Sequence, residues 1–219
     1  MPVRDWIKTR VFSWLASLLH FDKLLQIPFI ILHEVCGISY KDLIEAFMKK
    51  AHGENILNDI VSALEDKAAS IQNGGSEYSM SPKWLNTAWY PDELILINIC
   101  AGDQIDTFYR EAEARLVSLA KNYPTDIRPQ VITDAVRLNR AVLKQPYLTD
   151  NTSIQCTYNI WEIYQAALSC EQEELAKSNF KYEIDRTSQQ WTSWNDWCRE
   201  VVWYGNKKGD YIYPVKRSV

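Results

Sequence analysis

The sequence predicts a mainly helical protein, a bundle-like domain with a few short strands in its C-terminal third. Apolar residues recur at a spacing near 3.6 from about residue 6 to residue 145, as they do on one face of an α-helix. After Thr149 the spacing shifts toward two, which is typical of strands. With 219 residues, of which 47% are hydrophobic, the chain is long enough to bury a substantial core.

The first 71 residues are expected to form a four-helix unit. Pro28 lies near the start of the second apolar segment and Gly37 lies just past its end, where these residues suit a helix best. Ser39 and Asp42 have the spacing of a capping box at the start of the third helix. Apolar residues at helical spacing place the four helices at about residues 6–20, 24–35, 39–48 and 54–70.

Residues 72–83 are expected to form a loop, because QNGGSEYSMSP gathers Gly, Ser and Pro and loses the helical spacing. A helical region then covers residues 84–219, although the pattern also allows one domain over residues 1–219. Pro124 should close one of its helices, and Pro129 suits the first turn of the next. Helical spacing indicates helices at residues 92–101, 105–119 and 129–142.

Strands are expected only near the C-terminus, where apolar side chains alternate. A last helix should begin at Trp194, since Ser193 suits the N-cap, and end at Gly205. The segment GNKKGD should then turn the chain into a final strand that stops at Pro214. The candidate strands are residues 153–158, 179–184 and 211–213.

Tryptophan is the unusual component of the composition. The chain contains nine, and four of them crowd into thirteen positions near the C-terminus. On a helix that starts at Trp194, one stripe should face the core and include Trp197 and Val201. Residues on the opposite face must meet solvent, a partner or a ligand. The candidate interface or substrate-facing residues are therefore Arg199, Trp203 and Tyr204.

Charge and hydropathy exclude two classes of partner. A net charge of −4 and a pI near 5.5 provide no basic surplus for a phosphate backbone, so no nucleic acid is expected. The longest apolar run, residues 24–32, contains Gln26 and Pro28 and is far shorter than the roughly 20 residues that span a bilayer. We therefore expect no membrane insertion and a cytoplasmic location.

No complete catalytic, metal-binding or phosphate-binding motif occurs in the sequence. Five cysteines lie at wide, irregular intervals, which favours buried free thiols over disulfides or a metal site. His33 and Glu34 begin like the zinc-hydrolase motif HExxH, but Gly37 occupies the position of the second histidine. Nucleophile-elbow, Walker A and dinucleotide-binding glycine patterns are missing. The sequence therefore predicts no catalytic, cofactor-binding or metal-binding residue in this chain.

The segment LHEVCGISYKDLIEAF, residues 32–47, has the helix, glycine turn and helix of a helix-turn-helix unit, and it resembles the fourth region of extracytoplasmic-function sigma factors. A DNA-binding regulator should follow it with a helix that presents basic or amide side chains to the bases. Residues 54–70 are instead net acidic. An ordinary helical hairpin is the favoured interpretation.

Three stretches resemble one family: FDKLLQIPFIILHEVCGISYKDLIEAF, SPKWLNTAWYPDELILI and YEIDRTSQQWTSWNDWCREVVWYGNKKGDYIY. In amino-acid sequence and in their order along the chain, they are similar to the C-terminal region of cobalamin-binding radical S-adenosylmethionine (SAM) proteins. The resemblance spans nearly the whole chain. In that family a B12-binding domain precedes a partial barrel, where three cysteines at CxxxCxxC hold a [4Fe–4S] cluster that binds SAM. This chain has neither that spacing nor the B12-binding domain.

The resemblance implies a helical accessory domain that covers the barrel and shapes its substrate site, and that is inactive alone. The [4Fe–4S] cluster, SAM and cobalamin would belong to a catalytic chain encoded nearby, which would be its partner. Two other functions stay open: a free-standing helical interaction module and a helix-turn-helix DNA-binding regulator.

Overall fold

The protein is mainly helical, as the sequence predicted, with 56% of its residues in helices. The computed structural model describes residues 2–52, 55–124, 128–204 and 209–218. The first half contains α1 (Val3–Ala16), the π-helix η1 (Ser17–Phe21), α2 (Gln26–Cys36), α3 (Tyr40–Met48) and α4 (Ile56–Gln72). The second half contains α5 (Pro91–Ala101), α6 (Ile105–Ala120), α7 (Pro129–Val142), α8 (Ile160–Leu168), α9 (Trp194–Trp197) and the π-helix η2 (Cys198–Trp203). The strands are β1 (Ser79–Ser81), β2 (Thr87–Trp89), β3 (Thr152–Tyr158), β4 (Lys177–Ile184) and β5 (Val215–Arg217).

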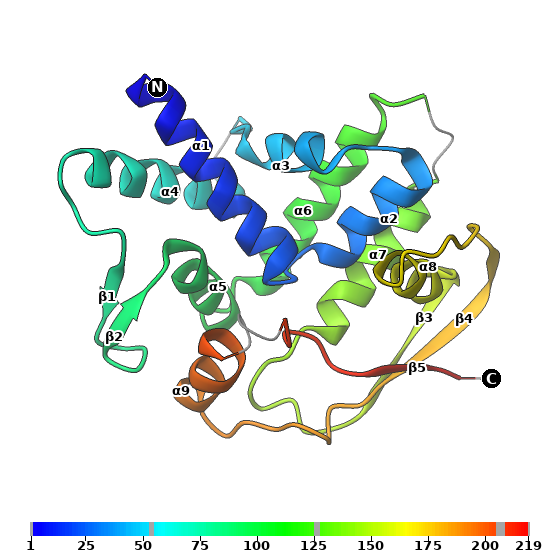
Figure 1. The fold of residues 1–219 in the computed structure, drawn as a ribbon. Coiled ribbons are helices and arrows are strands. Elements are labelled where there is room, and N and C mark those ends of the chain that lie inside the picture. The colour runs from blue at the N-terminus through cyan, green and yellow to red at the C-terminus, as the bar shows by residue number, and fades with distance from the viewer. Residues whose placement is uncertain (1, 53–54, 125–127, 205–208, 219) are drawn as a thin grey trace.

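Two small antiparallel sheets lie on opposite sides of the helical body (Figure 1). Strands β3, β4 and β5 form the sheet in the C-terminal third, with β4 in the middle. Alternate residues of β4 are buried, namely Phe180, Tyr182 and Ile184, which confirms the strand predicted at residues 179–184. Strands β1 and β2 form a hairpin near α4 and α5.

Buried apolar side chains from Val11 to Tyr213 form one continuous core. Within it α1 packs against α3 and α4, whereas α2 packs chiefly against α7 and α8. Asn139 of α7, which is fully buried, forms hydrogen bonds with the backbone at the start of α2. Its amide oxygen accepts a hydrogen bond from the backbone N–H of Ile27, and its amide nitrogen donates to the Leu24 carbonyl and the Tyr109 hydroxyl. The helices of the first and second halves are therefore joined by a buried polar contact as well as by apolar packing.

The hairpin β1–β2 corrects the prediction that strands occur only in the C-terminal third. It closes through Leu85 and Asn86, both of which have positive φ angles, 53° and 46°. Asn86 is a residue that tolerates this conformation, whereas leucine rarely adopts it, so the sequence shows no hairpin turn pattern at Leu85. The Trp89 indole is buried and donates its N–H to the Trp84 carbonyl, so a hydrogen bond links β2 to the loop that precedes it.

Two further elements differ from the prediction. Helix α8, which was not expected, follows β3 directly and packs against α2, where the Tyr164 hydroxyl donates to Gln26 at 2.7 Å. The final strand lies after Pro214 rather than before it. Ile212 forms only an isolated bridge with Leu143, and regular pairing begins where Val215 meets Ile184.

The first and last predicted helices end as π-helices. In η1 the Asp22 N–H bonds the Ser17 carbonyl, and after η2 the Tyr204 N–H bonds the Arg199 carbonyl, both five residues back. The predicted helix stop at Gly205 and most of the GNKKGD turn lie outside the described residues. Among the described helices none alone is long and apolar enough to cross a membrane; α1–η1 and α2 meet that test only as a pair bent by 93°.

Candidate functional site

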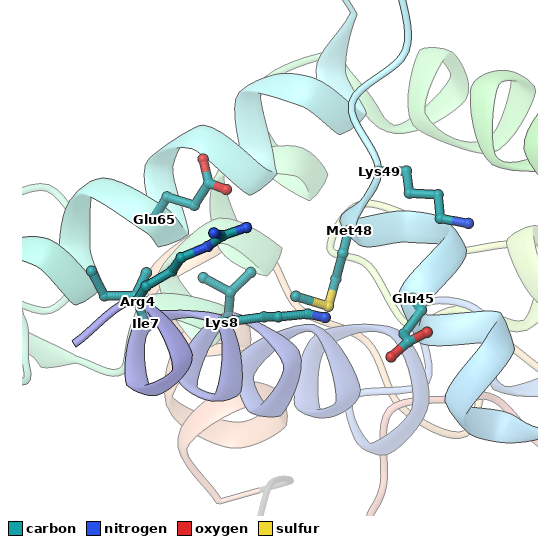
Figure 2. Close-up of a pocket in the computed structure, with 8 residues that line it drawn as sticks. Arg4, Ile7, Lys8, Glu45, Met48, Lys49 and Glu65 are labelled. Carbon is teal, nitrogen blue, oxygen red and sulfur yellow. The ribbon is translucent and has the colours of Figure 1, made fainter. Parts of the chain in front are cut away.

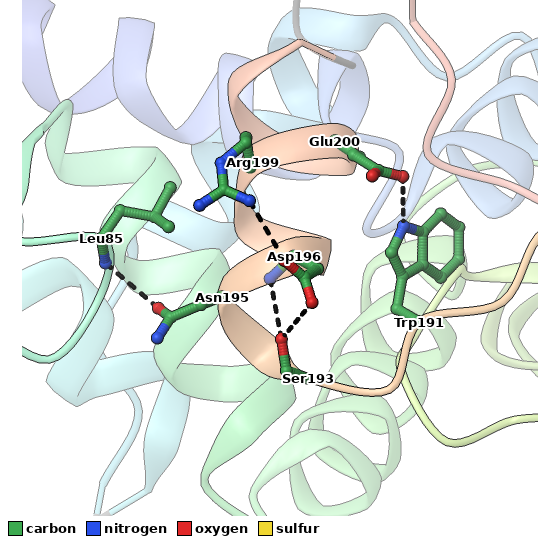
Figure 3. Close-up of polar contacts among 7 residues, drawn as sticks. All are labelled: Leu85, Trp191, Ser193, Asn195, Asp196, Arg199 and Glu200. Atoms are coloured by element: carbon green, nitrogen blue, oxygen red, sulfur yellow. Dashed lines mark hydrogen bonds and ion pairs between the residues drawn. The ribbon is translucent and has the colours of Figure 1, made fainter.

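The Trp-rich segment, which comprises α9 and η2, begins at a well-formed N-cap. The Ser193 hydroxyl accepts the Asp196 N–H at 3.1 Å, as the sequence predicted, and also donates to the Asp196 carboxylate at 2.7 Å (Figure 3). The other carboxylate oxygen of Asp196 pairs with Arg199 at 3.1 Å. A carboxylate in the first turn of a helix is stabilised by the free N–H groups there. Local polar contacts therefore fix where this helix starts.

Two contacts to distant residues hold the segment against the body of the protein, and a third joins it to the residues just before it. The Trp197 indole N–H donates to the Lys144 carbonyl at 2.9 Å within the core. The Trp191 indole N–H donates to the Glu200 carboxylate at 2.8 Å, and the Leu85 N–H of the hairpin donates to the Asn195 side chain at 3.1 Å (Figure 3). The segment is thus anchored to the core and to the β1–β2 hairpin.

The predicted division of this segment into a buried stripe and an exposed face is confirmed. Trp197 is 1% exposed, and Cys198, Val201 and Val202 are also buried. Trp203 and Tyr204, by contrast, are 46% and 53% exposed. Helical spacing predicts Trp194 on the same buried stripe as Trp197, but Trp194 is only half-buried and packs edge-on against Trp197.

The three candidate residues form an exposed surface at the end of the segment, which we call the Trp203 surface: Arg199, Trp203 and Tyr204. The rings of Trp203 and Tyr204 are stacked, with centroids 6.5 Å apart. Beneath them Trp203 meets the buried Trp89 ring edge-on at 6.0 Å. Trp89 is a support that sequence reasoning missed, since only the hairpin brings it close. A rigidly backed pair of exposed aromatic rings is typical of a contact surface.

A buried group of carboxyls lies where α5 packs against the two π-helices. Helix α5 packs against both η1 and η2, and its first turn carries Asp92 and Glu93. Asp22 follows η1 and is 2% exposed; its Oδ2 and the Oδ1 of Asp92 have no hydrogen-bond partner among the described residues. Burial, assisted by the neighbouring Asp92, raises the pKa of Asp22 well above its ordinary value. Burial likewise raises the pKa of Asp92 to about 6.

The Tyr211 hydroxyl bridges this group and η2. It donates to the Val202 carbonyl at 3.3 Å and interacts with Asp22. Nothing in the sequence marked Asp22 or Asp92 as unusual, because each is a common residue beside a helix and only the packing buries it. Their position suits a structural site whose protonation affects stability.

The histidines and cysteines form no metal site in the described part of the chain, where no group of three His, Cys, Asp or Glu side chains is placed to hold a metal. His33 bonds the Ile38 carbonyl through Nδ1 at 2.9 Å and packs on Tyr40. All five cysteines are free thiols, as predicted, and four are buried. Cys170 is exposed, so the prediction of a buried thiol is wrong there.

A mixed-charge pocket of about 350 Å³ lies between α1, α3 and α4. Figure 2 shows Arg4 and Lys8 of α1 facing Glu65 and Met48 across it. Glu65 is already paired with Lys50, and Glu45, at the same pocket, lies 4.0 Å from Lys41. Opposite charges alternate around this pocket, and they favour no single class of ligand.

Comparison with protein-family models finds no family that matches this chain, and comparison with curated proteins finds no match either.

Proposed function

We propose that this chain is a non-catalytic helical accessory domain, similar to the C-terminal region of a B12-dependent radical SAM enzyme, that covers the barrel of a cytoplasmic catalytic chain and shapes its substrate site. The observation that carries the proposal is the Trp203 surface. Two stacked aromatic rings stay about half exposed on a segment whose other face is anchored in the core. Aromatic residues are enriched at the centres of interfaces, so an exposed and well-supported pair of such rings is a candidate contact surface.

The described residues do not fit the [4Fe–4S] cluster that the resemblance implies. A cluster needs several thiolates close together, and no such group of side chains is present in this part of the chain. Burial raises the pKa of the Cys100, Cys156 and Cys198 thiols to about 12. These thiols therefore stay protonated near neutral pH, and a protonated thiol is a poor ligand. The cluster, SAM and cobalamin are accordingly assigned to the partner chain.

This assignment predicts that the chain will not take up a cluster by itself. Anaerobic incubation with iron and sulfide, followed by desalting, should leave a colourless protein without bound iron, and SAM should not bind it. Iron and acid-labile sulfide assays together with visible absorption provide the measurement. Retention of about four irons per chain, the content of a [4Fe–4S] cluster, would show that the assignment is wrong.

The docking role predicts that Trp203→Ala weakens binding to a cobalamin-binding radical SAM chain from the same genome. Loss of an aromatic anchor costs about 2 kcal/mol or more at an interface centre, which is roughly a thirtyfold higher Kd. Tyr204→Ala and Arg199→Ala should have smaller effects in the same direction. Isothermal titration calorimetry with each variant measures these changes.

Leu168→Ala serves as the control, because Leu168 is exposed to a similar degree on α8, away from the Trp-rich segment. This variant should bind like the unaltered chain. Equal affinity of the Trp203→Ala variant and the unaltered chain would remove the Trp203 surface from the interface. Failure of the unaltered chain to bind any such partner would favour the free-standing interaction module.

The DNA-binding alternative is the least supported by the described residues. Its base-contacting helix would be α4, which packs against α1 and α6. The charged side chains that α4 exposes are acidic, namely Asp59, Glu65 and Asp66, whereas Lys67 donates to the Tyr78 carbonyl. An acidic helix face repels the phosphate backbone.

A further inference from the structure

Four arginines converge on a groove of about 560 Å³ between α6, α7 and β3, which we call the arginine groove. Arg110 comes from α6, Arg137 and Arg140 from α7, and Arg186 from the segment that follows β4. The apolar side chains of Leu148 and Ile154 line the same groove. Such a concentration of positive charge is unexpected in a chain whose net charge is −4.

The carboxylates beside the groove do not neutralise it. Asp106 pairs with Arg140 at 2.8 Å, and Glu113 accepts a hydrogen bond from the Thr133 hydroxyl. Arg110 and Arg137 make no hydrogen bond or ion pair with any described residue. With four cations and two carboxylates, the groove keeps an excess of positive charge. Guanidinium groups left without an acceptor are available to an anion.

Arg186 provides the strongest evidence that the groove suits an anion. One of its terminal nitrogens donates to the Ala141 carbonyl at 2.9 Å, and its Nε is buried without a partner among the described residues. Burial and the neighbouring Arg140 lower the pKa of the Arg186 guanidinium. A buried donor without an acceptor and two like charges held close together are both costly, and a bound anion would relieve both.

We propose that the arginine groove binds a small organic phosphate, whose phosphoryl oxygens pair with Arg110, Arg137 and Arg186 and whose organic part lies against Leu148 and Ile154. The planar fork of a guanidinium matches two phosphoryl oxygens. The volume suits a small molecule, since ligand sites commonly measure about 300–1,000 Å³. The proposal is independent of the accessory-domain function, because it concerns different residues and a different class of ligand.

The test is calorimetric titration of the full chain with inorganic pyrophosphate, adenosine diphosphate and citrate at low salt. Both phosphates should bind saturably, with adenosine diphosphate the tighter because its organic part meets the apolar side chains. Citrate, a carboxylate of similar charge, should bind at least about tenfold more weakly. Arg137→Gln should raise the Kd for adenosine diphosphate at least about tenfold, and the Arg110→Gln, Arg137→Gln double variant further.

Arg4→Gln is the matched control, because it removes the same charge at the mixed-charge pocket between α1, α3 and α4. It should leave the Kd unchanged within about twofold, because Arg4 lines a separate pocket that shares no residue with the arginine groove. Arg110 and Arg137 are exposed and without partners among the described residues, so their variants should fold, which circular dichroism will verify. The proposal is overturned if neither pyrophosphate nor adenosine diphosphate saturates the chain at millimolar concentration, or if citrate binds with the same Kd as they do. It is also overturned if Arg4→Gln raises the Kd for adenosine diphosphate more than Arg137→Gln does.

Discussion

Replacement of Trp197 by alanine is expected to lower the free energy of unfolding by about 3–5 kcal/mol, the usual cost of deleting a large buried aromatic side chain. Trp197 is 1% exposed, so the variant would leave a cavity in the core. The change also removes the hydrogen bond to the Lys144 carbonyl, which connects the Trp-rich segment to the chain just after α7. Urea denaturation followed by circular dichroism measures the loss.

Trp203→Ala is the matched comparison on the same segment. Because Trp203 is 46% exposed, its replacement should lower the free energy of unfolding by less than about half as much as Trp197→Ala does. The loss that is still expected comes from its contact with Trp89. Trp197→Phe should fall between the two, since it keeps an aromatic ring but loses the indole N–H. Equal destabilisation by Trp197→Ala and Trp203→Ala would mean that both faces are internal, and the argument for a docking surface would lose its basis.

Asp92→Asn is expected to stabilise the protein above pH 6 and to have little effect below about pH 4. The pKa of Asp92 rises from an ordinary value of 3.8 to about 6 on folding, chiefly because the carboxyl is buried. The folded state therefore binds the proton more tightly than the unfolded state does. The contribution of the Asp92 carboxyl to the free energy of unfolding is therefore fully present below about pH 4, and it is lost as the pH rises through 6. A shift of about two pKa units corresponds to about 3 kcal/mol.

The measurement is the difference between variant and unaltered protein in unfolding free energy, followed from pH 4 to pH 7.5. Taking the difference cancels the contribution of His20, whose pKa is lowered by burial and whose effect on stability has the opposite sign. Asp22 adds to the expected trend, because Asp92 helps to raise its pKa. Asp59→Asn, at an exposed carboxylate in the first turn of α4, is the control for the substitution itself. A pH-independent difference for Asp92→Asn would contradict the prediction.

Much of the helical architecture could be predicted because its determinants lie within a few residues of each other. Ser39 and Ser193 cap helices through the N–H three residues ahead, and Pro129 occupies a first helical turn. The apolar spacing near 3.6 located α3, α4, α6 and α7 to within a few residues. The same local argument placed Trp197 inside and Trp203 outside.

Features that depend on distant partners could not be predicted in this way. The hairpin turns through Leu85 and Asn86, and Leu85 adopts a positive φ angle that a leucine in the sequence does not suggest. Strand β5 lies beyond Pro214 because its partner is the edge of β4, and the sequence of β5 does not reveal that partner.

The sequence by itself determined the fold class, the helix phases and the two faces of the Trp-rich segment, since each follows from side-chain spacing along one element. Only the tertiary structure revealed the buried carboxyls and the arginine groove. Asp22 and Asp92 become unusual when η1 and α5 pack together and exclude water from both carboxyls. Likewise Arg110, Arg137 and Arg186 come from three separate segments, and the packing of α6, α7 and β3 brings their charges to one groove. Burial and charge density are properties of the packed chain, so no local pattern encodes them.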